Sequence, residues 1–306
     1  ADVRVEAARA SVEEDRRHIL GMIREPCGPG YHKLNSTIAK HLQAWVVRCA
    51  STCLERRLAA GNLESELAAK LCVHVGHLLV RVGLLEKARV VLEQGRTLCE
   101  GTKSMETLLG SRLLREVAIS RRECGDVEQA EEALEQAREI LESIGELRSG
   151  DGASILSSIG FIRSEQGQVS AALQLYMEAR AIREFTDTLQ SMEGAMLMRN
   201  VGVARQLNGD LQGAEDALEE AKATYEYLGT LATPAGALLL TGMGNVRRER
   251  GDLAGALTQY THAQRIREQT GTLETPYGAD LLRLIGIVRR EEGDALAALA
   301  LYEEAR

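Results

Sequence analysis

The sequence repeats itself every 42 residues from its first third to its end. Residues 229–252, GTLATPAGALLLTGMGNVRRERGD, return 42 positions later at 271–294 as GTLETPYGADLLRLIGIVRREEGD. One glycine keeps this step through six copies: Gly83, Gly125, Gly167, Gly209, Gly251 and Gly293. A fixed period of this size indicates a repeat architecture, in which each copy is one small unit that buries its apolar stripe against its neighbours.

Two further columns keep the same period. Seven positions before each glycine stands a small residue: Gly76, Ala118, Gly160, Gly202, Gly244 and Gly286. Nine positions after it stands a Leu or a Tyr: Leu92, Leu134, Tyr176, Leu218, Tyr260 and Tyr302. Small residues let two helices approach closely, so we expect the large ones to fill the space beside them.

Each copy is predicted to form two helices. Apolar residues recur at helical spacing before the turn glycine (Leu239, Leu240, Met243, Val246) and after it (Leu253, Ala256, Tyr260, Ala263). The glycine suits a helix end that needs a positive φ. The aspartates that follow it are predicted to cap the second helix: Asp126, Asp210, Asp252 and Asp294.

Composition supports an all-α chain, because Ala, Leu, Glu and Arg dominate and only 4 of 306 residues are proline. Residues 69–306 are predicted to hold six helix-turn-helix units. Residues 1–68 do not repeat cleanly and are predicted to form an N-terminal helical cap, with helices over 2–24 and about 36–60. The chain ends as a second helix finishes, so we expect further repeats, another domain or a partner subunit beyond residue 306.

Several functions are disfavoured. A net charge of −8 argues against a nucleic-acid or anionic-membrane binder, and there is no run of 18 apolar residues. Phosphate-binding glycine loops and nucleophile elbows are absent, so neither catalysis nor a cofactor is expected. The six cysteines all lie before residue 125 and are predicted to be reduced thiols of an intracellular, cytoplasmic protein.

A zinc site could be imagined from Cys72, His74 and His77 with Cys49 and Cys53. These residues come from two separate predicted helices and lack the paired spacing of structural zinc sites. Small buried cysteines are common in helical cores. We therefore expect no metal.

The pattern Leu240-x-x-Met243-Gly244, Gly251, Ala256, Tyr260 and Ala263 resembles the tetratricopeptide repeat. The 42-residue unit, with AQRIREQTGTLETPYGA (263–279) joining one helix pair to the next, resembles the repeats of kinesin light chains. The resemblance covers about 69–306. It implies a right-handed α-solenoid of stacked antiparallel helix pairs, whose first helices line a concave groove that receives peptides.

One column departs from the family. Where a bulky aromatic residue is expected near the end of the first helix, this chain has Arg121, Arg163, Arg205, Arg247 and Arg289. Arginine near a helix C-terminus interacts favourably with the helix dipole, and its stem covers apolar surface. Glu123, Glu165, Glu249 and Glu291 stand beside these arginines as possible partners. We interpret this column as structural.

Helical phase predicts which side chains face the groove: Arg115, Arg122, Arg199, Asn200, Asn245, Arg248, Arg283 and Arg290. Asn could pair with a peptide backbone and Arg with carboxylates, so the implied ligand is an extended acidic peptide or a protein. The leading hypothesis is a non-enzymatic scaffold for protein–protein interaction. The alternatives are a permanent structural subunit of a larger assembly, and the cargo or sensor repeats of a larger multidomain protein.

Overall fold

A computed structural model describes residues 51, 52, 54–56, 65–81 and 83–306. Every regular element among these residues is an α-helix. The predicted helix at 2–24 lies outside the described residues. Of the one predicted at 36–60, residues 51, 52 and 54–56 are described, and they are helical. The division at residue 68 therefore stays a prediction.

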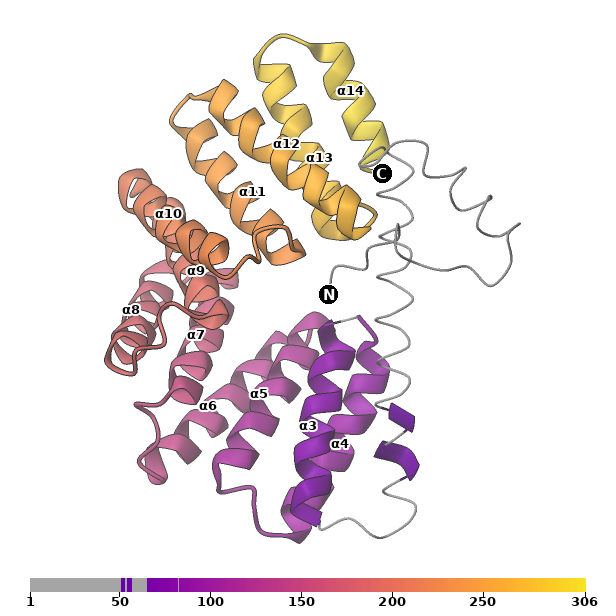
Figure 1. The fold of residues 1–306 in the computed structure, drawn as a ribbon, viewed down its shortest axis with the longest axis vertical. Helices are drawn as coiled ribbons and strands as arrows, with labels where there is room; N and C mark the ends of the chain where they lie inside the picture. The colour runs from indigo at the N-terminus through magenta and orange to yellow at the C-terminus, as the bar shows by residue number, and fades with distance from the viewer. Residues whose placement is uncertain (1–50, 53, 57–64, 82) are drawn as a thin grey trace, which may run out of the picture. The chain divides into compact units, whose positions relative to one another are not determined.

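The described residues form two compact units, divided between Leu228 and Gly229. The longer unit contains four helix pairs: α3 (Ser65–Arg81) with α4 (Leu85–Gly101), α5 (Leu108–Glu123) with α6 (Val127–Ser143), α7 (Gly150–Glu165) with α8 (Val169–Phe185), and α9 (Met192–Leu207) with α10 (Leu211–Tyr227) (Figure 1). The shorter unit contains α11 (Pro234–Glu249) with α12 (Leu253–Thr270), and α13 (Pro276–Glu291) with α14 (Ala295–Glu304).

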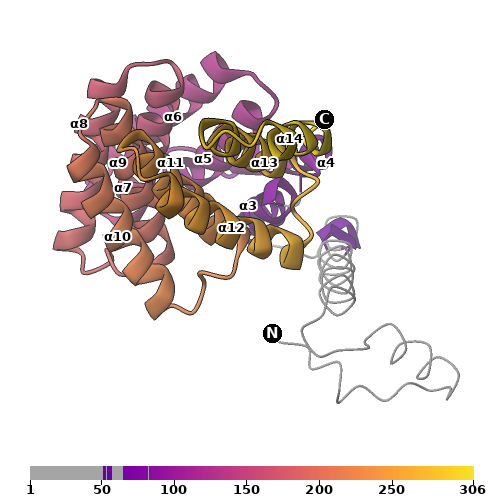
Figure 2. The same ribbon diagram turned by 90° about the horizontal axis from the view of Figure 1, so that it is seen from above.

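Within each unit, successive pairs stack in chain order (Figures 1 and 2). The two helices of a pair pack together, and the second helix also packs on the first helix of the next pair. First helices contact one another as well: α3 with α5, α5 with α7, α7 with α9, and α11 with α13. The predicted stack of helix pairs is confirmed within each unit.

The turn between the helices of a pair has the predicted chemistry. Gly209 has a φ of +81° and Gly125 one of +90°, a conformation that residues with a Cβ rarely adopt. The following aspartate caps the second helix in three turns: the backbone amide of Gly213 donates to Asp210 at 2.9 Å, that of Gly255 to Asp252 at 2.8 Å, and that of Ala297 to Asp294 at 3.0 Å. The prediction is wrong for Asp126, whose side chain makes no capping bond. The donor position three residues after the aspartate is Gln129 in this turn, whereas the three capped turns have a Gly or an Ala there.

The two predicted columns meet inside each pair. A Cβ placed on Gly160 would lie 2.8 Å from Cε1 of Tyr176, and one on Gly202 would lie 2.6 Å from Cγ of Leu218. Both large side chains are only 1% exposed. The small residue therefore sets how closely the helices of a pair approach, and the residue 16 positions later fills the space that it leaves.

Candidate functional site

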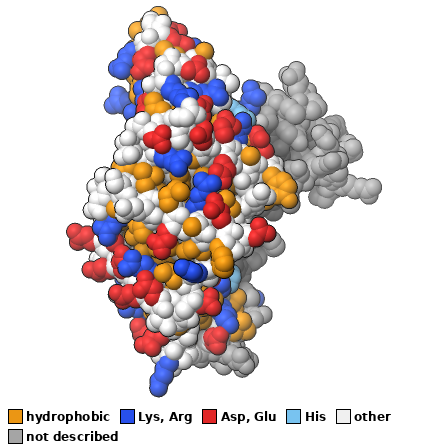
Figure 3. Space-filling view, turned by 90° about the vertical axis from the view of Figure 1, so that its left-hand side faces the viewer, with side chains coloured by type: hydrophobic (Ala, Val, Ile, Leu, Met, Phe, Trp, Pro, Cys, Tyr) orange, Lys and Arg blue, Asp and Glu red, His pale blue; other side chains and the backbone are white. Residues whose placement is uncertain are grey.

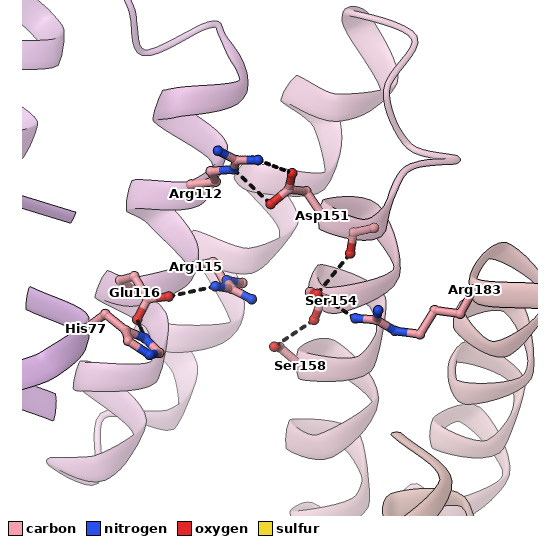
Figure 4. Close-up of polar contacts among 9 residues, drawn as sticks. His77, Arg112, Arg115, Glu116, Asp151, Ser154, Ser158 and Arg183 are labelled. Carbon is pink, nitrogen blue, oxygen red and sulfur yellow. Dashed lines mark hydrogen bonds and ion pairs between the residues drawn. The ribbon is translucent and has the colours of Figure 1, made fainter. Parts of the chain in front are cut away.

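The first helices of the longer unit, α3, α5, α7 and α9, form a continuous layer. In a curved stack of helix pairs, the helices that contact the corresponding helix of the next repeat lie on the inner side of the curve. We therefore call the solvent-facing side of this layer the inner face. It carries polar side chains from four repeats. Three of its helices, α3, α5 and α7, supply most of the residues labelled in Figure 4, and α8 supplies Arg183.

The arginine column at the end of the first helices braces the turn. Arg205 Nη1 donates to the backbone carbonyl of Gly213 at 3.0 Å, and Arg121 Nη1 donates to that of Gln129 at 3.3 Å. Arg163 Nη1 bonds Gln168 at 3.1 Å. Each bond joins the end of a first helix to the start of its second helix, which supports the structural interpretation.

Two of the glutamates beside that column, Glu165 and Glu291, pair with an arginine of a neighbouring first helix. Glu165 of α7 pairs with Arg122 of α5 at 3.4 Å, and Glu291 of α13 pairs with Arg248 of α11 at the same distance. These bridges run between neighbouring first helices. Glu165 and Glu291, named above as possible partners of the structural arginines, thus pair with an arginine 43 positions earlier on the adjacent first helix.

The predicted peptide-contacting residues of the longer unit already have partners. Arg115 Nη2 donates to Glu116 at 2.8 Å, and Arg199 Nη2 donates to Asn200 at 2.8 Å. Arg122 also pairs with Glu123, and its guanidinium lies 4.5 Å from the centre of the Phe161 ring. The structure brings Arg115 and Arg122 together on α5 and Arg199 and Asn200 together on α9.

In the shorter unit the predicted residues differ in exposure. Asn245 accepts a hydrogen bond of 2.6 Å from the buried Tyr260 hydroxyl. Arg283 pairs loosely with Asp280 at 3.6 Å and is exposed, as is Arg290. Arg248 is held by Glu291. Thus Arg283 and Arg290 are open to solvent, whereas Asn245 helps to hold the core tyrosine.

A group of linked polar side chains occupies the inner face of α3, α5 and α7 (Figure 4). Glu116 is 1% exposed and accepts hydrogen bonds from His77 at 3.0 Å and Arg115 at 2.8 Å. Burial alone would raise the pKa of Glu116, but the hydrogen bond from His77 and the charge of Arg115 outweigh it and lower that pKa. Nearby, Arg112 holds Asp151 through two bonds of 2.9 and 2.7 Å. A hydrogen bond therefore links α3 to α5, and an ion pair links α5 to α7.

Arg183, near the end of α8, is a buried charged residue that helical phase and motif spacing did not single out. It is 4% exposed, and its Nη2 donates to Ser154 Oγ on α7 at 2.9 Å. Its Nε–H is buried without a partner, and its one side-chain hydrogen bond among the described residues is the one to Ser154. Burial lowers its pKa, as does Arg115, while Glu193 and Asp151 act in the opposite direction. A signal was available in the 42-residue column of Arg183, which also contains Cys99, Leu141, Tyr225 and Arg267. Two arginines, Arg183 and Arg267, thus stand in a column that is otherwise apolar, and both are buried.

No metal site is found in the described part of the chain, where no three His, Cys, Asp or Glu side chains converge. His74 bonds the backbone carbonyl of Lys70, and His77 bonds Glu116, while Cys49 and Cys53 lie outside the described residues. Cys72 is a buried free thiol whose pKa burial raises to about 11. Such a thiol is a core residue and not a nucleophile.

The face in Figure 3 is chemically mixed. Acidic and basic side chains are interspersed there, and hydrophobic side chains show between them. A shallow pocket of about 280 Å³ lies between α4, α5 and α6, with Arg96, Arg121 and Glu132 among its lining residues. As for the membrane, none of the helices in the part of the chain that the structure describes combines the length and hydrophobicity needed to cross a bilayer.

Comparison with known proteins agrees with this geometry. The tetratricopeptide repeat family model matches residues 111–185, which run from the start of α5 to the end of α8. No curated protein matches the sequence. The predicted resemblance to the tetratricopeptide repeat is confirmed over residues 111–185.

Solved structures with the same fold include BtubC (BKLC) from P. vanneervenii, which is 20% identical with a TM-score of 0.57 over 72% of this chain and 89% of its own. A second is a Podosopora anserina putative kinesin light chain with nearly identical TPR-like repeats. It shares 18% sequence identity with this chain and has a TM-score of 0.53, and the match covers 69% of this chain and 99% of its own. A third is the Rap conjugation gene regulator of the plasmid pLS20 in complex with the Phr* peptide. It shares 15% sequence identity with this chain and has a TM-score of 0.57, and the match covers 86% of this chain and 73% of its own. At these identities the likeness shows the fold alone.

Proposed function

We propose that this protein is a non-enzymatic scaffold that binds a protein partner through an extended, acidic segment lying on the inner face of the longer unit. The observation that carries the proposal is the continuous layer α3–α5–α7–α9, which presents Arg115, Arg122, Arg199 and Asn200 from helices held by their neighbours. Side chains fixed on packed helices lose little freedom when they bind, and this favours affinity.

The fold supports a peptide ligand. The Rap regulator, whose structure resembles this one, was solved in complex with a peptide. Arginine suits an acidic partner, because its planar group can form two parallel hydrogen bonds with a carboxylate. We assign the scaffold to the cytoplasm, since the described cysteines, Cys72, Cys99 and Cys124, are free thiols. Neither a nucleic acid nor a membrane is a proposed partner.

Permanent membership of a larger assembly is the second candidate. Leu296 and Leu299 of α14 are 84% and 55% exposed, and a packed neighbour would cover them. A related candidate is a longer multidomain protein in which these helix pairs are the cargo or sensor repeats. This candidate places the contact on α14 of the shorter unit and leaves the inner face of the longer unit open.

A selection experiment tests the first candidate. Dodecapeptides from a random phage-displayed library are selected on the 306-residue chain and synthesised, and their affinity is measured by fluorescence polarisation. The double variant Arg199→Ala, Asn200→Ala on the inner face should weaken binding at least tenfold. A matched control removes the outer pair Arg180 and Glu220, which join α8 to α10 at 3.4 Å, and should change affinity by less than twofold. Equal affinity for the inner-face variant and the wild type would reject the assignment.

A further inference from the structure

The outward-facing stripe of the second helices carries no large apolar side chain in three of the repeats. The stripe consists of three residues that stand four positions apart and therefore lie on one side of the helix. Its members are Glu93, Thr97 and Gly101 on α4, Glu135, Glu139 and Ser143 on α6, and Thr261, Arg265 and Gln269 on α12. None of these residues is buried, so the position is a solvent-facing one.

The stripes of α8 and α10 differ from this pattern. Their members are Met177, Ala181 and Phe185 on α8, and Glu219, Ala223 and Tyr227 on α10. Phe185 is 80% exposed and Tyr227 is 78% exposed, although they occupy the same position of two successive repeats. Met177 is 41% exposed. Folding gains little from aromatic rings that remain in water, whereas such rings are enriched in binding surfaces.

The two stripes belong to one surface of the longer unit. Both α8 and α10 pack on α9, and Arg180 Nη2 of α8 lies 3.4 Å from Glu220 Oε2 of α10. Figure 3 faces the side on which α8 and α10 lie in Figure 1, and hydrophobic side chains show there among charged ones. We call the apolar members of the two stripes the outer patch: Met177, Ala181, Phe185, Ala223 and Tyr227.

Acidic side chains surround the outer patch. Arg180 lies 2.8 Å from Glu184 and 3.4 Å from Glu220. Lys222 lies 3.7 Å from Glu219 and 3.9 Å from Glu226, so two basic groups face four carboxylates. Residues 177–187 and 219–228 together contain six acidic and three basic side chains, and one of the three, Arg183, is buried. The surface around the aromatic rings is therefore negatively charged.

We propose that the outer patch binds a basic amphipathic helix of a partner protein. The rings of Phe185 and Tyr227 can pack against apolar side chains of that helix and can attract a cationic group above their faces. The surplus carboxylates can pair with lysine or arginine beside its apolar stripe. The stripe from Met177 to Phe185 is about 12 Å long, which matches apolar residues at i, i+4 and i+8 of a docked helix.

Charge distinguishes this occupant from others. An anionic membrane and an acidic peptide would both be repelled by the surface around the outer patch. A second copy of this chain has a net charge of −8 and would be disfavoured for the same reason. The outer patch also lies on second helices, so it is separate from the inner face and does not depend on the function proposed above.

The test measures fluorescence anisotropy with the 306-residue chain and a labelled helical peptide of about 18 residues, or five turns. The peptide carries leucine at i, i+4 and i+8 with lysine and arginine beside this stripe. In one matched peptide glutamate replaces every basic residue, and in the other the same residues are reordered so that no apolar face forms. We expect saturable binding of the first peptide that weakens with salt, and roughly tenfold weaker binding of the other two.

Variants locate the binding surface. The double variant Phe185→Ser, Tyr227→Gln introduces residue types that other repeats have at this position, Ser143 and Gln269. It should keep its melting temperature, because both side chains are exposed, and should bind the basic helix roughly tenfold more weakly. The matched control Val90→Gln removes an apolar side chain that is 53% exposed on α4 and should leave the affinity unchanged.

The outcomes decide between occupants. Failure of the basic helix to bind, or equal binding to the wild type and the double variant, overturns the proposal. Tighter binding of the acidic helix overturns the choice of a basic partner. A wild-type dimer in analytical ultracentrifugation that dissociates in the double variant overturns it in favour of a second copy. Binding that is lost in the double variant but kept in Arg199→Ala, Asn200→Ala supports the outer patch, whatever the inner face binds.

Discussion

Gly160→Ala tests the close approach on which the helix pairs depend. Gly160 lies in the middle of α7, and the added Cβ would stand 2.8 and 3.0 Å from two ring carbons of Tyr176 and 3.3 Å from the backbone oxygen of Ala172. Ordinary carbon–carbon contacts are about 3.5–4.0 Å. Because the Tyr176 ring is rigid and 1% exposed, α7 and α8 must separate by several tenths of an ångström.

The magnitude follows from two opposing terms. Replacing glycine with alanine inside a helix favours folding by about 1 kcal/mol. Overpacking a tight core opposes it by about 1–3 kcal/mol, and the contact here is near the middle of that range because the ring cannot bend away. We expect a net loss of about 1 kcal/mol, or a melting temperature about 2–4 °C lower for a unit of this size.

Circular dichroism gives the melting temperature, and hydrogen exchange of the α7 and α8 amides locates the change. The matched control is Gly150→Ala in the same helix, where no atom lies within 4 Å of the new Cβ and stability should hold or rise slightly. Adding Tyr176→Leu should relieve the clash, because Ala118 and Leu134 already occupy the corresponding positions of the preceding pair. A Gly160→Ala protein as stable as the Gly150→Ala control would refute the reasoning.

Two further predictions concern buried polar groups. Glu116→Gln should cost about 1–3 kcal/mol at pH 7, because the pKa of Glu116 is lowered by His77 and Arg115 and its ionised form is therefore stabilised by folding. This contribution is lost as the pH falls through the lowered pKa, so the difference in melting temperature between variant and wild type should shrink below about pH 4, and a constant difference would contradict it. Iodoacetamide at pH 8 should label the exposed Cys124 at once. It should label Cys72, whose pKa burial raises to about 11, only after unfolding. Peptide mapping by mass spectrometry measures both labelling rates, and equal rates for the two cysteines would contradict the assigned burial.

The repeat could be predicted from sequence because its cause is local and periodic. A glycine with positive φ, a small residue seven positions earlier and a large one nine positions later are each required in every copy. The helix pairs followed from these columns. The pairing of individual charges could not be predicted in this way. Arg122 and Glu165 pair across two neighbouring helices, and the 42-residue columns contain no information on side-chain rotamers.

The candidate site was predictable in part. Helical phase placed Arg115, Arg199 and Asn200 on first helices of the longer unit, where the structure has them. Arg183 escaped because it belongs to a second helix, a position that the peptide-binding pattern of the family does not use. Comparing the copies column by column would have found it together with Arg267, because both arginines stand in line with the buried Leu141 and Tyr225.

Site-specific photo-crosslinking tests the central claim most directly. Benzoylphenylalanine is introduced at position 157 on α7, in the 42-residue column of Arg115 and Arg199, or at the exposed position 174 on α8, and each protein is irradiated with a selected dodecapeptide. An inner-face binder predicts a cross-linked product from position 157 and little or none from position 174. A product from position 174 alone would contradict the account and place the partner on the outer helices.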